Sequence, residues 1–288
     1  MTLPHTGFIV DGQREYPQAF KDAGIVVRNY LDDPRLKLDL DPEGGRDGSA
    51  RSTKWIRAVV FHTTRGRWPQ EIRPGVSPPS PDGESNARYW SRSSGMAGAH
   101  LIVDSGREIL QTADLSRVAA YHAGGVNDVT IGVEIVQFAN GLIWEDELDP
   151  VCLLLADFLT LRFEIQRQFQ ELYHGGPCKR LKAGGADCVG LYGHRDQTSD
   201  RGRGDPGDAL WVKLRAAGYE GVDFERNTDV GVWKARQRHL NSIGARSGVN
   251  LKADGIPGPA TAKALRDLTK HPLWVHRPFD NSYLHNKG

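Results

Sequence analysis

Two short apolar runs, each leading into a histidine, constrain this chain most. Val189–Tyr192 leads to His194, and Trp55–Phe61 leads to His62. Asp205 follows His194 by eleven positions and stands directly before a proline. Runs of this kind, bounded by turn residues, predict strands, and proline stiffens the turn that holds the carboxylate. We therefore expect the chain to fold around a site that two imidazoles and one carboxylate share.

His62, His194 and Asp205 form the ligand set of a catalytic zinc ion. Two neutral imidazoles and a carboxylate bind the metal, and the fourth position stays open for water. The chain contains 10 histidines, so the alternative is that either histidine is a structural or surface residue. The three residue types together indicate Zn²⁺ as the cofactor.

A glutamate in an apolar setting is a second chemical signal. Residues 131–137 read Ile-Gly-Val-Glu-Ile-Val-Gln and predict a strand, on which Glu134 shares a face with Gly132 and Val136. A carboxylate with apolar neighbours either pairs with a charge or takes part in chemistry. Beside a zinc-bound water it would take a proton and pass it to a leaving amine. The alternative is an edge-strand glutamate that faces solvent; the apolar flanks favour catalysis.

The remaining patterns predict an α/β fold, with a mixed central sheet flanked by helices and a small C-terminal helical domain. The expected parts are an irregular N-terminal extension over 1–50, a catalytic domain over 51–221, a helical domain over 228–270 and a tail over 271–288. Within the catalytic domain we expect a hairpin over 99–111, helices over 150–168 and 208–217, and a long loop over 65–95. In the strand over 55–62, the side chains expected to share one face are Ile56, Ala58, Val60 and His62.

Composition excludes several kinds of partner. The chain has 37 basic and 36 acidic residues, so nothing favours nucleic acid or an anionic membrane surface. No apolar run approaches transmembrane length, and no signal peptide is visible. We expect no nucleic-acid partner, no membrane insertion, and synthesis in the cytoplasm. The three cysteines form no CxxC pair, although Cys178 and Cys188 flank one loop and could pair.

Six short phrases occur in an order typical of one enzyme family. They are Val59–Thr64, Ala99–Gly106, Tyr121–Gly125, Thr130–Val136, Gly193–Asp196 and Asp205–Gly207. Over residues 51–217 the chain therefore resembles the zinc-dependent N-acetylmuramoyl-L-alanine amidases of the amidase-2 family, which includes phage lysozyme and peptidoglycan recognition proteins. The resemblance implies hydrolysis of the amide between N-acetylmuramic acid and L-alanine. The expected C-terminal binding domain, described below, favours a lytic enzyme similar to endolysins.

The resemblance also implies roles for individual residues. His62, His194 and Asp205 match the zinc ligands, and Glu134 matches the general acid and base. The family often has a lysine two residues before the aspartate ligand, to stabilise the oxyanion. This chain has Arg203 there, whose planar guanidinium differs in geometry from an ammonium group.

His122, in the phrase Tyr-His-Ala-Gly, matches a position in the family's substrate groove rather than a ligand. His100 is expected to be a packed strand histidine.

The C-terminal part resembles a small helical peptidoglycan-binding domain. The matching positions are Gln237, Leu240, Asn241, Gly244, Asp254, Gly255, Gly258, Pro259, Thr261, Ala264 and Leu265, with Pro257 in place of an aromatic residue. The alternative is a helical dimerisation or lid module. The expected partner is polymeric peptidoglycan, met by a monomer after release or export. Rival functions are a non-catalytic peptidoglycan-recognition protein, a muropeptide-recycling amidase, and a zinc hydrolase for another amide.

Overall fold

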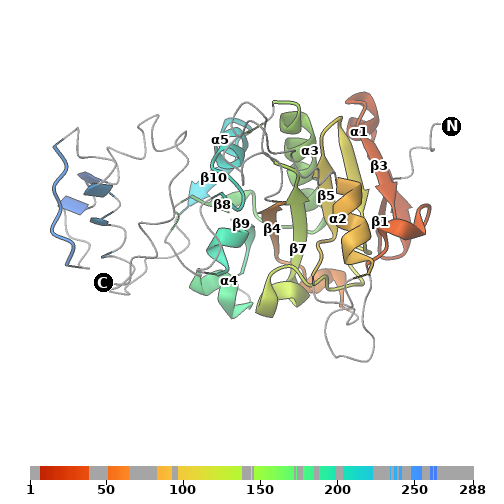
Figure 1. The fold of residues 1–288 in the computed structure, drawn as a ribbon, viewed down its shortest axis with the longest axis horizontal. Helices are drawn as coiled ribbons and strands as arrows, with labels where there is room; N and C mark the ends of the chain where they lie inside the picture. Colours follow the sequence, from red (N-terminus) through yellow and green to blue (C-terminus); the bar gives the residue numbers. More distant parts are fainter. Residues whose placement is uncertain are drawn as a thin grey trace, which may run out of the picture.

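An eight-stranded mixed sheet forms the centre of the fold (Figure 1). The computed structural model describes residues 7–38, 51–64, 83–92, 97–137, 144, 146–171, 173, 178–184, 188–198 and 204–222, with isolated positions between 234 and 264. The strands are β1 (Phe8–Val10), β2 (Gln13–Glu15), β3 (Val26–Asn29), β4 (Ala58–Thr63), β5 (Leu101–Asp104), β6 (Glu108–Gln111), β7 (Thr130–Ile135), β8 (Gln168–Gln170), β9 (Gly190–Gly193) and β10 (Glu220–Val222). The sheet order is β10-β8-β9-β4-β7-β5-β6-β3, and β1 pairs with β2 separately. The predicted strands that lead to His62 and His194 are neighbours.

Most neighbouring strands in the sheet run parallel. The exception is the β5–β6 hairpin, which is antiparallel and confirms the hairpin expected over 99–111. β4 lies between β7 and β9 and is parallel to both. Parallel sheets need cover on both faces, and the fully buried pattern of β4 agrees with that rule.

Helices cover both faces of the sheet (Figure 1). They are α1 (Gln18–Asp22), α2 (Gly83–Trp90), α3 (Leu148–Arg162), α4 (Lys179–Ala183) and α5 (Ala209–Ala216), with 3₁₀ turns η1 (Pro34–Leu36), η2 (Thr53–Trp55), η3 (Gly124–Val129) and η5 (His194–Asp196). Residues of α3 and α5 share one core with Val59 and Phe61 of β4. On the other face, residues of α4 and η3 pack with Ala58 and Val60, and α2 packs over β5 and β6. The expected α/β fold is confirmed.

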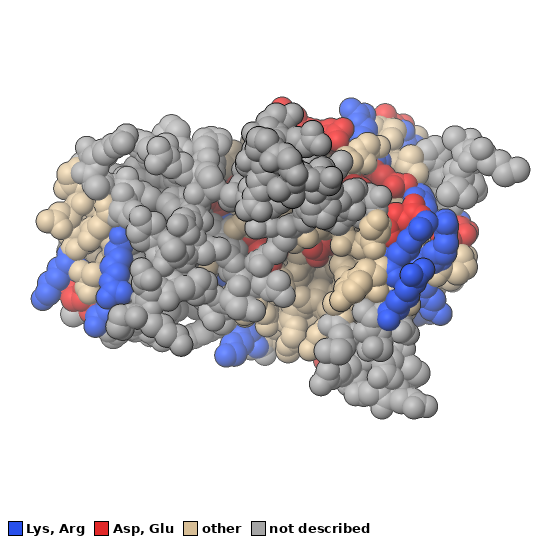
Figure 2. Space-filling view, viewed as in Figure 1, with Lys and Arg blue, Asp and Glu red and all other residues tan. Residues whose placement is uncertain are grey.

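The N-terminal extension is more regular than the sequence predicts. β3 is parallel to β6 and forms the edge of the main sheet, so the expectation of an irregular segment is wrong. Arg28 of β3 forms ion pairs with Asp33 at 2.9 Å and Glu108 at 3.2 Å. Figure 2 shows basic and acidic side chains together at this end of the molecule. Pairing across the sheet, which a local pattern cannot reveal, makes this segment part of the main fold.

Two local predictions need correction. Ile56 packs with the core of Val59 and Phe61, because it lies just outside β4 and the strand alternation begins only at Ala58. The helix expected over 150–168 ends at Arg162. Glu164 has a φ of 52°, a left-handed conformation that a helix cannot continue through.

The three cysteines are free and buried, so Cys178 and Cys188 are not paired. Among the described residues, no helix is long and apolar enough to cross a membrane.

Most of the predicted C-terminal domain and the whole tail over 271–288 lie outside the described residues. Where it is described, Gln237 Nε2 lies 3.2 Å from Thr261 Oγ1, and Asn241 Nδ2 donates to the Leu251 carbonyl at 2.7 Å. Leu240 is buried. The domain and its peptidoglycan-binding role stay predictions.

Candidate metal centre

The carboxyl ends of three adjacent strands meet at the site. β9, β4 and β7 are parallel, so their carboxyl ends lie at one edge, the usual place for a site in such sheets. His62 of β4 pairs in register with Glu134 of β7. His194 directly follows Gly193, the last residue of β9. The sheet therefore brings both histidines and the glutamate into one row.

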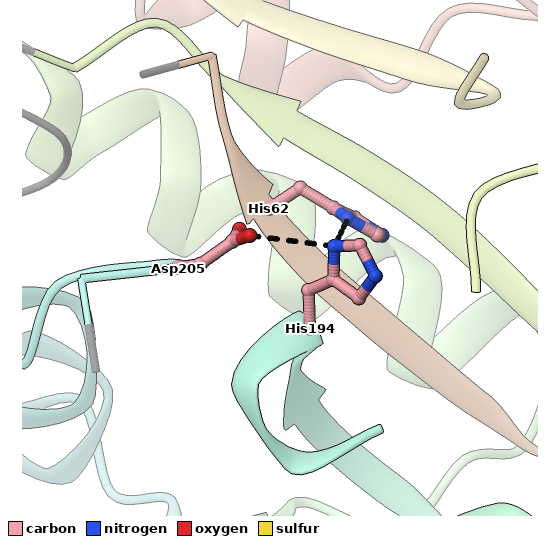
Figure 3. A group of neighbouring side chains, drawn as sticks. All are labelled: His62, His194 and Asp205. Carbon is pink, nitrogen blue, oxygen red and sulfur yellow. Dashed lines mark hydrogen bonds and ion pairs between the residues drawn. The ribbon is translucent and has the colours of Figure 1, made fainter. Parts of the chain in front are cut away.

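His62, His194 and Asp205 point toward one another (Figure 3). The Nδ1 atoms of the two histidines are 2.8 Å apart, and His194 Nδ1 lies 3.3 Å from Asp205 Oδ2. One donor atom from each residue lies within 4.8 Å of the others. A tetrahedral zinc ion would hold such atoms about 3.3 Å apart. The three residues therefore fit a zinc ion after a small separation of the histidine rings.

The carboxylate of Asp205 is oriented by the backbone. The Thr63 N–H donates to Asp205 Oδ1 at 2.8 Å, which leaves Oδ2 on the side of His194. Gly193 permits the close approach of this turn, since a Cβ there would lie 2.9 Å from Pro206 Cδ and 3.1 Å from the Asp205 carbonyl. The glycine before His194 and the proline after Asp205 therefore lie against each other, where the segments that carry the two candidate ligands meet.

Arg195 supports the turn that carries His194. Its side chain is 1% exposed, and it forms an ion pair with Asp208 at 2.6 Å. The guanidinium of Arg195 lies 5.4 Å from the ring of Trp211, and the main-chain N–H of Arg195 donates to the Asp205 carbonyl at 3.0 Å. Buried Arg195 therefore links the turn that carries His194 to the segment that carries Asp205.

Glu134 lies on a central strand. β7 is flanked by β4 and β5, with Glu134 opposite His62 and Ile102. The edge-strand alternative is therefore excluded. The residue is half-buried and lines the same groove as the three candidate ligands. Its catalytic role stays a prediction.

His122 lies against His62. Its Nδ1 is 3.0 Å from His62 Nε2, and its Nε2 is 3.0 Å from Thr130 Oγ1. Burial, assisted by the nearby charge of Arg51, holds the pKa of His122 well below its usual range, so the ring is neutral at neutral pH. The sequence pattern does not reveal the contact with His62, because the two residues are 60 positions apart. The predicted role of His122 in substrate binding stays a prediction.

A groove of about 400 Å³ opens beside the candidate centre. Helix α2 contributes Asn86, Tyr89 and Trp90, and Tyr121 lines it before η3. Aromatic side chains with a few polar groups are typical of ligand sites. Sequence reasoning missed α2 because its Pro- and Ser-rich surroundings predict a loop; the adjacent Tyr89 and Trp90 were the available signal.

His100 is fully buried, and its Nδ1 accepts from the Gly132 N–H at 3.0 Å. The structure therefore bears out the expectation of a packed histidine beside the sheet. Arg203 lies outside the described residues, so its oxyanion role stays a prediction.

Comparison with known proteins identifies the family of this chain. Residues 51–208 match the amidase-2 family, N-acetylmuramoyl-L-alanine amidase. No curated protein matches this chain. Among solved structures, the catalytic domain of XlyA is 17% identical with a TM-score of 0.40, covering 67% of this chain and 98% of that one.

A mutant endolysin from Bacillus subtilis is 20% identical with a TM-score of 0.39, covering 67% of this chain and 97% of that one. The Drosophila peptidoglycan recognition protein SD is 16% identical with a TM-score of 0.41, covering 70% and 99%. The family match spans more than half of the chain and includes His62, Glu134, His194 and Asp205. The chain belongs to the N-acetylmuramoyl-L-alanine amidase family.

Proposed function

We propose that this protein is a zinc-dependent hydrolase that cuts the amide between N-acetylmuramic acid and L-alanine in peptidoglycan. The observation that carries the proposal is the convergence of His62, His194 and Asp205 at one groove with Glu134. Membership of the amidase family supplies the bond and the substrate class.

The chain's own residues divide the chemistry between them. His62 Nδ1, His194 Nδ1 and Asp205 Oδ2 would hold zinc, which when bound acidifies a water ligand and polarises the amide carbonyl. Glu134 takes the proton from the attacking water and gives it to the nitrogen of the leaving L-alanine. Arg203 donates to the carbonyl oxygen as that oxygen gains negative charge. One carboxylate therefore serves as base first and acid second.

The proposed substrate is the polymeric cell wall, reached after release or export. The groove is open and lined by Tyr89, Trp90 and Tyr121, and Tyr89 is 66% exposed. The exposed rings of Tyr89 and Tyr121 suit an extended sugar–peptide chain that lies along a surface. A C-terminal peptidoglycan-binding domain would keep the enzyme on an insoluble substrate by raising its effective concentration. We therefore favour a lytic enzyme over a recycling amidase.

The test is digestion of purified peptidoglycan sacculi, with mass spectrometry of the released products. We expect free stem peptides that begin with L-alanine and intact glycan strands. Exhaustive chelation should abolish release, and added zinc should restore it. Binding to sacculi without release would identify a non-catalytic recognition protein, and full activity after chelation would contradict the metal assignment.

Two further substrates separate the rival enzymes. Faster cleavage of soluble anhydromuropeptides than of sacculi would favour a recycling amidase. Cleavage of amides that contain no muramic acid would indicate a hydrolase of different specificity.

His194→Ala should remove both bound zinc and activity, because it deletes the ligand that lies between His62 and Asp205. Zinc per chain, measured by atomic emission on the purified variant and the wild type, checks this result. A variant that keeps one zinc per chain would exclude His194 as a ligand.

A further inference from the structure

His62 directs one ring nitrogen at the candidate metal centre and the other at His122. Its Nδ1 lies 2.8 Å from His194 Nδ1, and its Nε2 lies 3.0 Å from His122 Nδ1. A neutral imidazole carries one hydrogen, and only the nitrogen without it can bind a metal. The position of that hydrogen therefore decides whether His62 Nδ1 can be a zinc ligand.

A chain of hydrogen bonds that ends at a main-chain carbonyl sets this position. Thr130 Oγ1 lies 2.8 Å from the Val126 carbonyl, which can only accept, so the hydroxyl donates to it. The same oxygen then accepts from His122 Nε2 at 3.0 Å, which leaves His122 Nδ1 without a hydrogen. His122 Nδ1 accepts in turn from His62 Nε2. The lone pair with which His62 can bind a metal then lies on Nδ1, the atom that faces His194.

The opposite order of donors would leave His62 unable to bind zinc through Nδ1. If Thr130 donated to His122, the Val126 carbonyl would lose this donor, and His122 would donate to His62 Nε2. The hydrogen of His62 would then lie on Nδ1, where it would block zinc.

Strand β7 is shaped to hold the His122 ring. A Cβ on Gly132 would lie 2.7 Å from His122 Nδ1 and closer still to Cγ, so the ring occupies space that any larger residue would fill. Thr130, Gly132 and Glu134 alternate along β7 and share one face. This face provides an anchor for His122, room for its ring, and the proposed catalytic carboxylate.

We propose that Thr130 and His122 are positioning residues that hold His62 as the Nε2–H tautomer and thereby set the affinity for zinc. The inference rests on the proposed zinc-dependent function. Both nitrogens of His122 are engaged within the protein, so His122 acts through His62, and only its ring carbons are left for the groove.

We call the hydrogen-bond chain from the Val126 carbonyl through Thr130 and His122 to His62 the relay. The variant that tests it is Thr130→Val, which keeps the shape of the side chain but removes the oxygen. Loss of a partner behind a metal-binding histidine weakens metal affinity about 10- to 100-fold, so we expect a zinc dissociation constant raised by that factor. Thr130→Ser should restore it. Gly132→Ala, which changes no polar group but fills the space of the His122 ring, should reproduce the loss. Competition with a chromophoric chelator at fixed pH measures all three.

Thr160→Val is the matched control. Thr160 is buried in α3, and its hydroxyl donates to the carbonyl four residues earlier at 2.8 Å, just as Thr130 does. Its helix packs on the opposite face of the sheet from His62. Thr160→Val should therefore bind zinc as tightly as the wild type, which separates the relay from general destabilisation.

A second measurement needs no variant. Two-bond ¹⁵N–¹H correlation spectra of the metal-free wild type should place the hydrogens of both His62 and His122 on Nε2. A hydrogen on His62 Nδ1, or a Thr130→Val protein with wild-type zinc affinity, would overturn the relay. A wild type that binds no zinc would overturn it too.

The relay and the proposed function can fail separately. If the wild type binds zinc and Thr130→Val weakens it, but no peptide is released from sacculi, the relay stands and the amidase proposal falls. If sacculi are digested and Thr130→Val binds zinc normally, the amidase stands and the relay falls.

Discussion

Glu134 can be tested by a change of one atom. Glu134→Gln keeps the shape of the side chain opposite His62 but cannot accept a proton. We expect zinc content to stay at the wild-type level, while turnover falls by about 10²–10⁴-fold. Zinc analysis and peptide release from the same preparation check both halves of the prediction. Turnover near that of the wild type would place the proton shuttle on another residue.

Arg203 is a second single-residue test, because the family often has lysine at this position. The carbonyl oxygen gains charge when water attacks, and one preorganised donor is worth about 10²–10³ in turnover. Arg203→Ala should therefore lower turnover about a hundredfold with zinc retained, and Arg203→Lys should restore most of it. Steady-state kinetics on a soluble muropeptide measures the effect. An alanine variant with unchanged turnover would remove Arg203 from the catalytic residues.

The candidate metal ligands could be predicted from the sequence, whereas the residues that position them, such as Thr130, could not. His62 and His194 each end an apolar run, and Asp205 precedes a proline, so local patterns mark all three. No local sequence pattern distinguishes Thr130. Its proposed role depends on the position of His122, which in turn depends on how β7 and the preceding turn pack. Side-chain contacts between distant segments are set by register, which local periodicity does not encode.

A buried ion pair between Arg195 and Asp208 joins η5 to the start of α5. Removing it should lower the free energy of unfolding. Asp208→Ala would leave the guanidinium of Arg195, 1% exposed, without its 2.6 Å partner. Breaking a buried pair by removing one member costs about 3–5 kcal/mol. We expect the free energy of unfolding, measured by urea denaturation, to fall by that amount. Zinc affinity should fall with it, because η5 carries His194.

The control for this prediction is an exposed ion pair in the same chain. Arg14 and Asp32 are 2.7 Å apart, with side chains 47% and 33% exposed. Asp32→Ala should change the free energy of unfolding by less than about 1 kcal/mol. Equal losses in the two variants would show that the Arg195 pair has no special role.

Among the strands and helices, the sequence predicts best those that are buried along the whole strand or along one helix face. β4, β7 and β9 and the helices α3 and α5 follow from their apolar patterns. β3 is a short apolar piece whose partner, β6, lies far along the chain, so its place in the sheet could not be inferred. α2 has only three buried residues, too few to mark a helix within a stretch rich in turn formers.

The proposed division of the molecule into a catalytic part and a C-terminal binding domain can be tested by truncation. A chain that ends after Val222 keeps β10, which pairs with β8, and loses the predicted peptidoglycan-binding domain. It should cleave soluble muropeptides at the wild-type rate but lose about tenfold or more on sacculi, because tethering helps only when the substrate is immobile. Parallel assays on both substrates, with a thermal melt as a folding control, measure this. Equal losses on both would mean that the C-terminal part supports the fold.

The nearly touching histidines of the site are 132 residues apart in the chain. A metal held by both would act as a reversible crosslink between β4 and the far end of β9, and would bind only the folded chain. By mass action, zinc at a hundred times its dissociation constant would add about 2.7 kcal/mol to the free energy of unfolding. Zinc supply would then govern how long the enzyme survives proteases as well as how fast it works. In surroundings poor in zinc, the protein would lose this added stability together with its activity.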